Sequence, residues 1–349
     1  TDLLTISKTK DQHTTMLTLP LMLFIVLIEL CVGQFTVMYV LDWRHSVKRS
    51  FLILYAFIYL FLTGLTYLFQ QGFSSSDLLN SFNLLDHHWT GSLTTPLVLF
   101  LILLIPYMLF LLLDKKAGIA NDGNQPEGAE GEVTKPAISV LYILRMLSGG
   151  LAVLAGLATL FVVGMIYHPL GGSVIGGWLV VAGFFAAALA LGGVMTAMWL
   201  GHWYLVTPAM TEKPLLLSTT LVLVGVALEV IFFLIGGAVV APAQASISNQ
   251  SPPAITATAT VAPSTHTTAA TAPVLKTANV PSVTPLSTSA IGWIRILVGF
   301  AIPLILGSLS WKLVRDRSFQ SATGMLYLIV VCTLAGEIMA RGLFLIGLQ

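Results

Sequence analysis

Long, continuously apolar runs dominate this 349-residue chain, and polar residues gather between them. A transmembrane helix needs about 20 predominantly apolar residues, and the runs do not alternate as the strands of a membrane barrel do. The eight predicted helices are Met16–Leu41, Ser50–Phe69, Leu93–Leu113, Ala137–Tyr167, Val174–Trp199, Pro214–Val240, Ala290–Trp311 and Ser321–Leu348. The pattern therefore predicts an all-α polytopic membrane protein built as a bundle of eight transmembrane helices.

Composition supports this class and excludes others. Hydrophobic residues make up 56% of the chain and charged residues 9%, with a mean hydropathy of +0.90, whereas soluble domains carry about 25% charged residues. A net charge of +1 argues against a nucleic-acid partner. The N-terminal segment lacks a cleavable signal pattern, so we expect the first helix to remain as an anchor. The two cysteines, Cys31 and Cys332, are too few for a four-ligand metal site, and we expect no metal centre in this chain.

Lysine and arginine placement predicts the orientation in the membrane. Eleven basic residues fall to one side of the predicted bundle and five to the other. The larger group is Arg44, Lys48, Arg49, Lys115, Lys116, Lys135, Arg145, Lys213, Lys312, Arg315 and Arg317. The smaller group is Lys8, Lys10, Lys276, Arg295 and Arg341. This asymmetry predicts a cytoplasmic (inner) membrane protein with both termini outside.

The chain divides into three parts. Residues 1–240 hold the first six predicted helices, and residues 290–349 hold the last two, which complete the same bundle. Residues 241–289 between them are rich in Thr, Ala and Pro and contain few large apolar residues. Such a segment cannot build a core of its own, so we expect an extended external linker.

Charged residues inside the apolar runs are candidates for function. Glu337 and Arg341 lie four residues apart in the last run, where a helix places them on one face and lets them neutralise each other. We interpret them as a structural intramembrane pair. Glu29 and Glu229 are single carboxyls within their runs. Each is either a proton-handling or quinone-contacting group, as intramembrane ionisable residues often are, or a protonated packing residue. Packing is the favoured interpretation for Glu229, and both stay open for Glu29.

The histidines do not predict a haem. His88 and His168 are the only pair at the predicted outer ends of facing helices, and neither lies inside a span. The loop after the second helix, residues 70–92, is more informative, because it brings His87 and His88 together with amide groups at the membrane surface. Apolar walls with a few hydrogen-bonding groups suit a quinone head group, but an amphipathic surface loop has the same composition.

Several short motifs, taken together, resemble the membrane-anchor subunit of the dimethyl sulfoxide reductase family, an eight-helix protein with an external N-terminus. The closest match is Leu334–Phe344, LAGEIMARGLF, which is similar to the family's terminal GE-x-x-GR-x-x-F. The weaker matches are Leu19–Phe24 (LPLMLF), Cys31–Phe35 (CVGQF), Asn80–Leu84 (NSFNL) and Trp293–Leu297 (WIRIL).

The resemblance implies a subunit without a redox centre of its own. It implies non-covalently bound menaquinone or another quinone near the outer face. It also implies electron exchange with a four-cluster iron–sulfur subunit, and through it with a molybdopterin catalytic subunit. No catalytic residue of the chain itself is predicted; the predicted quinone-binding residues are Gln70, His87, His88 and Glu29.

This chain departs from the family pattern at two positions. Gln70 stands where the family has a histidine linked to quinol oxidation, and Thr94–Pro96 stand where it has a carboxylate. Glutamine can hydrogen-bond a quinone carbonyl but cannot accept its proton near neutral pH, so His87 or His88 would have to take that role.

Two other functions are compatible with the sequence. One is a purely structural membrane subunit of an electron-transfer complex with no quinone site. The other is a proton-coupled transporter using Glu29 and Glu229, although the paired broken helices typical of such transporters are missing from the pattern.

Overall fold

The computed structural model describes residues 2–80, 82–115, 117, 140–207, 211–248 and 288–346. Eight of its helical segments are long and apolar enough to cross a membrane, and the described residues contain no strand. The predicted all-helical architecture and number of spans are thus confirmed. The membrane-length helices are α1 (Asp2–Trp43), α2 (Arg49–Phe73), α5 (Thr94–Leu113), α6 (Val140–Tyr167), α7 (Val174–Val206), α8 (Lys213–Ser248), the continuous unit α9–η2–α10, and α11 (Phe319–Ile346). That unit comprises α9 (Thr288–Arg295), the π-helix η2 (Ile296–Ala301) and α10 (Ile302–Arg315). Short helices α3 (Ser76–Leu79), α4 (His87–Thr90) and η1 (His168–Gly171) lie in the connections.

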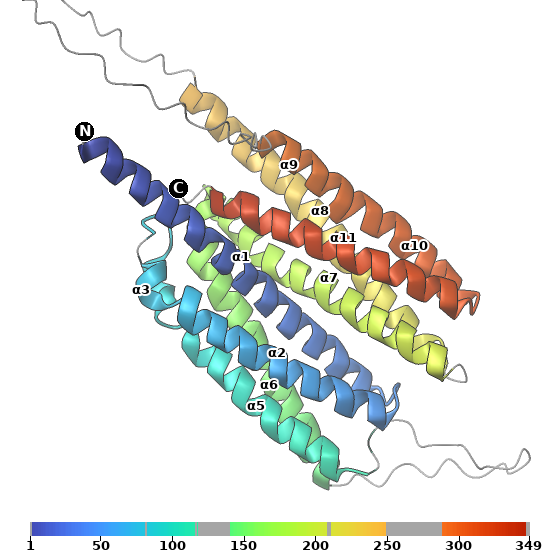
Figure 1. Cartoon of the computed structure of the whole chain (residues 1–349). Helices are drawn as coiled ribbons and strands as arrows, with labels where there is room; N and C mark the ends of the chain where they lie inside the picture. The colour runs from blue at the N-terminus through green and yellow to red at the C-terminus, as the bar shows by residue number, and fades with distance from the viewer. Residues whose placement is uncertain are drawn as a thin grey trace, which may run out of the picture.

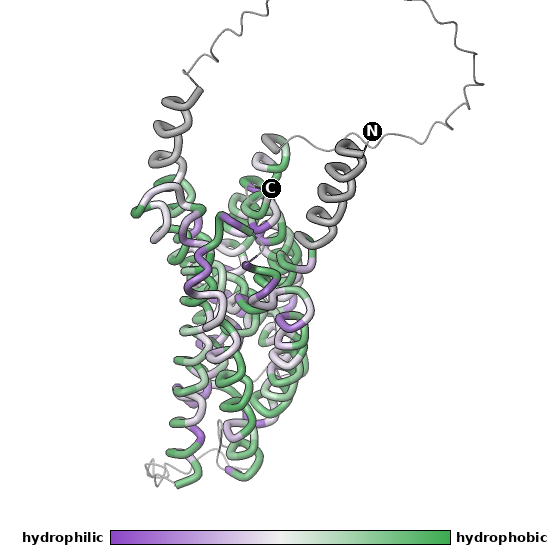
Figure 2. The backbone as a smooth tube through the Cα atoms, turned by 90° about the vertical axis from the view of Figure 1, so that its left-hand side faces the viewer, coloured by the Kyte–Doolittle hydropathy of each residue, from purple (hydrophilic) through white to green (hydrophobic). Residues whose placement is uncertain are grey.

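Helices α1 and α7 form the centre of the bundle (Figure 1). Helices α2, α5 and α6 pack on one side of them, and α8, α10 and α11 on the other. Glycines allow the two central backbones to touch: a Cβ added to Gly33 would lie 1.8 Å from the Ala188 carbonyl oxygen, and one added to Gly192 would lie 2.1 Å from the Gly33 carbonyl carbon. Small residues at helix interfaces favour such close packing in membranes. Apolar residues run along the length of the bundle (Figure 2).

The start of α1 and the end of α11 lie at the same end of the bundle, as an even number of spans requires (Figure 1). We call this the terminal end, and the other the distal end. Two of the distal turns end their helices with a residue other than glycine in the left-handed region, His45 (φ 47°) and Arg317 (φ 58°). In each, the next residue donates back five positions, as Ser46 N does to Leu41 O at 3.1 Å. This bond satisfies a carbonyl that the end of the helix would leave free.

Several helix bounds differ from the predicted ones, and the differences in α2 and α8 affect predicted loop segments. Helix α2 continues to Phe73, so Gln70 belongs to the helix and not to the loop after it. Helix α8 continues to Ser248, so the first residues of the predicted linker are helical, and residues 249–287 lie outside the described residues. The seventh span is α-helical except for the π-turn of η2, just before Pro303. Proline lacks an N–H and its ring crowds the preceding turn, and the widened turn, with Ile302 N–H donating to Leu297 O, accommodates this.

Candidate functional site

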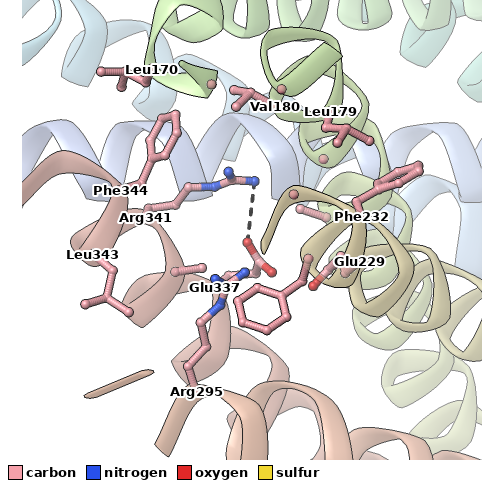
Figure 3. A pocket seen from close by; sticks show the side chains of 17 residues that line it. Leu170, Leu179, Val180, Glu229, Phe232, Arg295, Glu337, Arg341, Leu343 and Phe344 are labelled. Carbon is pink, nitrogen blue, oxygen red and sulfur yellow. Dashed lines mark ion pairs between the residues drawn. The ribbon is translucent and has the colours of Figure 1, made fainter. Parts of the chain in front are cut away.

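A cavity of about 410 Å³ lies near the terminal end, between α7, α8, α9 and α11 (Figure 3). Its volume falls within the range of about 300–1,000 Å³ typical of small-molecule sites. The walls are mainly apolar and are formed by Leu170, Leu179, Val180, Phe232, Leu343 and Phe344, among others. Glycines open the space: a Cβ added to Gly183 or Gly236 would meet nothing within 4 Å.

Four charged side chains line this apolar cavity: Glu229 on α8, Arg295 on α9, and Glu337 and Arg341 on α11. The two on α11 form an ion pair, with Arg341 Nη2 3.5 Å from Glu337 Oε2 (Figure 3). Glu229 and Glu337 approach each other from opposite helices, and Arg295 lies beside them. A pattern in which three helices each contribute a charge to one apolar space is typical of an intramembrane functional site.

A fifth charged residue, Glu29 on α1, does not line the cavity but contacts one of these four side chains. Its Oε1 accepts a hydrogen bond from Arg341 Nη2, and the carboxyl group is fully buried. Arg341 therefore joins Glu29 and Glu337 and also lies 4.3 Å above the Phe184 ring. These contacts hold the guanidinium at the edge of the cavity. We refer to Glu29, Glu229, Arg295, Glu337 and Arg341 as the intramembrane cluster.

Arg295 is held by aromatic rings. Its Cζ lies 5.3 Å from the Phe233 ring centroid and 5.2 Å from that of Phe300, distances at which a guanidinium is attracted to the ring face. It has no carboxylate oxygen within ion-pair distance among the described residues. The π-turn η2 follows Arg295 directly and contains Phe300.

The cluster contains three carboxyl groups and two guanidinium groups, so full ionisation would leave a net charge of −1. A lone charge within the apolar span costs about 2.5–3.5 kcal/mol on the insertion scale. Binding one proton removes that cost. Two carboxyl groups placed side by side, as Glu229 and Glu337 are, share a proton readily because like charges at short range disfavour double ionisation. The cluster is therefore suited to hold, accept and release a proton.

The residues predicted for quinone binding do not come together at this cavity. None of the four lines it. Glu29 contacts Arg341 at its edge, and Gln70, His87 and His88 lie elsewhere. Gln70 is buried in α2, donates to Thr94 Oγ1 at 3.0 Å and accepts from Gln71 at 2.8 Å. His87 Nε2 lies 3.0 Å from the Phe82 carbonyl oxygen, and His88 is exposed beside Trp89.

Gln70 and Thr94 thus form a neutral hydrogen-bonded pair between α2 and α5. Neither side chain can accept a proton near neutral pH.

A second charged network, which the sequence did not reveal, lies at the distal end. Arg145 is fully buried, 3.2 Å from Asp42 Oδ1 and 3.1 Å from Asp114 Oδ2. The Tyr107 hydroxyl donates to Asp42 at 2.9 Å. The network ties together the ends of α1, α5 and α6. A signal was present, since Asp42 and Asp114 each close a long apolar run and Arg145 lies inside the run that follows Asp114. The orientation rule uses Arg145 only as a positive charge on one side of the bundle.

The fold and its apolar spans define the class: a multi-pass helical membrane protein. The chain matches no protein-family model, no curated protein and no solved structure.

Proposed function

We propose that this chain is the quinone-binding membrane subunit of a respiratory electron-transfer complex, and that the quinone head group binds in the cavity of the intramembrane cluster. The observation that carries the proposal is an apolar cavity in which carboxyl groups and guanidinium groups converge within the membrane span. The motif with the closest family resemblance supports it, because Glu337, Ala340, Arg341 and Phe344 all line this cavity.

The chemistry assigned to the cluster is proton exchange. Oxidation of a quinol releases two electrons and two protons. Glu229 and Glu337 accept the protons in turn, and the arginines hydrogen-bond the oxygen atoms of the ring. The electrons pass to a partner subunit, which the family resemblance implies is an iron–sulfur protein serving a molybdopterin subunit. The proposed quinone site therefore differs from the one predicted from the sequence near Gln70 and His88, and it lies on the opposite side of the central helices α1 and α7.

Binding of a fluorescent quinol analogue, a hydroxyquinoline N-oxide, to the purified subunit in nanodiscs tests this proposal. We expect Gly183→Leu to weaken binding at least tenfold, equivalent to about 1.4 kcal/mol, because the new side chain fills the cavity while its Cβ meets no atom within 4 Å. Glu337→Gln should also weaken it. Gly64→Leu, where a Cβ likewise meets nothing, and His88→Ala are the matched controls and should bind normally.

Other outcomes favour other functions. Normal binding in Gly183→Leu together with lost binding in His88→Ala would return the site to the α4 region. No binding by the unchanged protein would support a purely structural subunit.

The proposed orientation places the terminal end outside the cytoplasmic membrane. We expect a membrane-impermeant maleimide to label Asp77→Cys but not Arg315→Cys in intact cells, in a background with both native cysteines replaced by alanine. Both positions are exposed, Asp77 on α3 and Arg315 at the end of α10, so accessibility is matched. Labelling of Arg315→Cys alone would reverse the orientation.

A further inference from the structure

The buried face of α2 carries a row of polar side chains. Tyr55, Tyr59, Thr63, Thr66 and Gln70 follow one another at spacings of three or four residues, and each is at most 2% exposed. The row spans 15 residues, about 22 Å along a helix. Polar side chains on a membrane helix often hydrogen-bond to neighbouring helices, so the partners of these groups decide what the row does.

Three hydroxyl groups in and beside this row form no hydrogen bond of standard geometry within the described residues: Tyr59 OH, Thr63 Oγ1 and Thr196 Oγ1 of α7. Their nearest polar groups are each other and the Cys31 thiol, which they approach only at looser hydrogen-bonding geometry. All three side chains are completely buried. Other buried hydroxyls of the bundle bond to the carbonyl four residues before them, as Thr159 does at 2.9 Å and Thr219 at 2.8 Å. Thr63 and Thr196 do not form this hydrogen bond to their own helix. Buried polar groups without a protein partner are the usual sites of internal water.

The three hydroxyls lie in one interface, formed by α1, α2 and α7. Thr63 lies beside the Cys31 sulfur, and Tyr59 lies beside Thr196. Toward the distal end the row continues to Tyr55, whose ring contacts Trp199 at 5.4 Å between centroids. Toward the terminal end it continues to Thr66, whose hydroxyl is 3.3 Å from Cys31 Sγ.

The row reaches the depth of the intramembrane cluster. Glu29 lies two residues before Cys31 on α1, a rise of about 3 Å, and its Oε2 is buried without a hydrogen-bond partner in the described part of the chain. The two residues share a depth but not a helix face, since Glu29 contacts Arg341 of α11 and Cys31 contacts Thr66 of α2. The hydroxyls of Tyr59, Thr63 and Thr196 therefore lie on the distal side of this level.

We propose that the interface of α1, α2 and α7 holds internal water and conducts protons between the level of Glu29 and the distal end of the bundle. At each step a hydroxyl or water oxygen accepts a proton through a lone pair and releases its own proton to the next oxygen. One O–H bond forms as another breaks, one proton moves, and nothing is oxidised or reduced. The inference goes beyond the proposed function, because such a route operates whether or not the cavity binds a quinone.

The thiol of Cys31 provides a reporter for this route. Its S–H stretching band is isolated in the infrared spectrum, and the Cys332→Ser background makes it the only cysteine of the chain. After transfer of the full-length protein in nanodiscs to D₂O, we expect the band to exchange to S–D within minutes. Tyr59→Phe, Thr63→Val and Thr196→Val each remove one hydroxyl at nearly constant size and should slow exchange at least tenfold.

Thr219→Val is the matched control, because Thr219 is equally buried but its hydroxyl bonds to its own helix. It should leave the exchange rate unchanged. The Thr196 variant is the most informative, because Thr196 lies beside Tyr59, whereas the Cys31 thiol contacts Thr66. A Cys31 band that persists for hours in the unchanged protein, or equal rates in all four variants, would overturn the proposal. Neither result depends on quinone binding, so the two proposals can fail separately.

Discussion

Replacing Arg341 by methionine should destabilise the bundle more than any other single change in the intramembrane cluster. Among the residues that the structure describes, only Arg341 contacts two carboxyl groups of the cluster, Glu29 and Glu337, at ion-pair distance. Its removal leaves these acids buried at 0% and 4% exposure without their counter-charge. Breaking a buried pair in this way costs about 3–5 kcal/mol. The free energy of unfolding in mixed micelles, followed by circular dichroism, measures the loss.

The control is Arg315→Met, which removes an exposed guanidinium at the end of α10 and should change stability by less than about 0.5 kcal/mol. Adding Glu337→Gln to Arg341→Met removes one of the unbalanced charges and should recover part of the loss. Strictly additive effects of the two substitutions would show that the residues do not interact.

Arg145→Met should produce a loss of similar size at the distal end. The Arg145 guanidinium is fully buried between Asp42 and Asp114, and these three residues hold α1, α5 and α6 together. Methionine preserves much of the packing volume but leaves two carboxyls in an apolar environment, at a cost of about 3–5 kcal/mol. Thermal unfolding in detergent, measured at fixed protein concentration, should show a lowered midpoint.

Two further variants make this result specific. Arg44→Met removes an exposed arginine from the same end of the bundle and should leave the midpoint nearly unchanged. Arg145→Met combined with Asp42→Asn should be more stable than Arg145→Met alone. A midpoint unaffected by Arg145→Met would mean that the network contributes little to holding the three helices.

The spans were predictable because each is a long and predominantly apolar run, and its length separates it from a loop or strand. The pairing of Glu337 with Arg341 could be proposed because the two share one helix face. Glu29 could not be assigned as a partner of Arg341, since the two are 312 residues apart in the chain. Only the packing of α1 against α11 brings them together.

Arg145 and Arg295 lie inside the predicted fourth and seventh helices, but the orientation rule counts them only as charges on one side of the bundle. In the structure one is buried in a network and the other lines the cavity. The rule that predicts orientation counts positive charges along the chain, and it does not tell in which direction a side chain points from its helix. The polarity of Gln70 ends an apolar run and predicts a loop there, whereas α2 continues beyond Gln70 and buries its amide against Thr94.

The π-turn of η2 has a consequence for comparing this chain with others. A π-turn is equivalent to one residue inserted into an α-helix, and one residue corresponds to a rotation of about 100°. Suppose that a homologous span lacks this extra residue and that its second half faces the same surroundings as α10. In an alignment without a gap, the residue paired with Arg295 would then point away from the cavity. Alignments of the seventh span therefore require a one-residue gap between Arg295 and Pro303, and a gapless alignment would pair residues that face different surroundings.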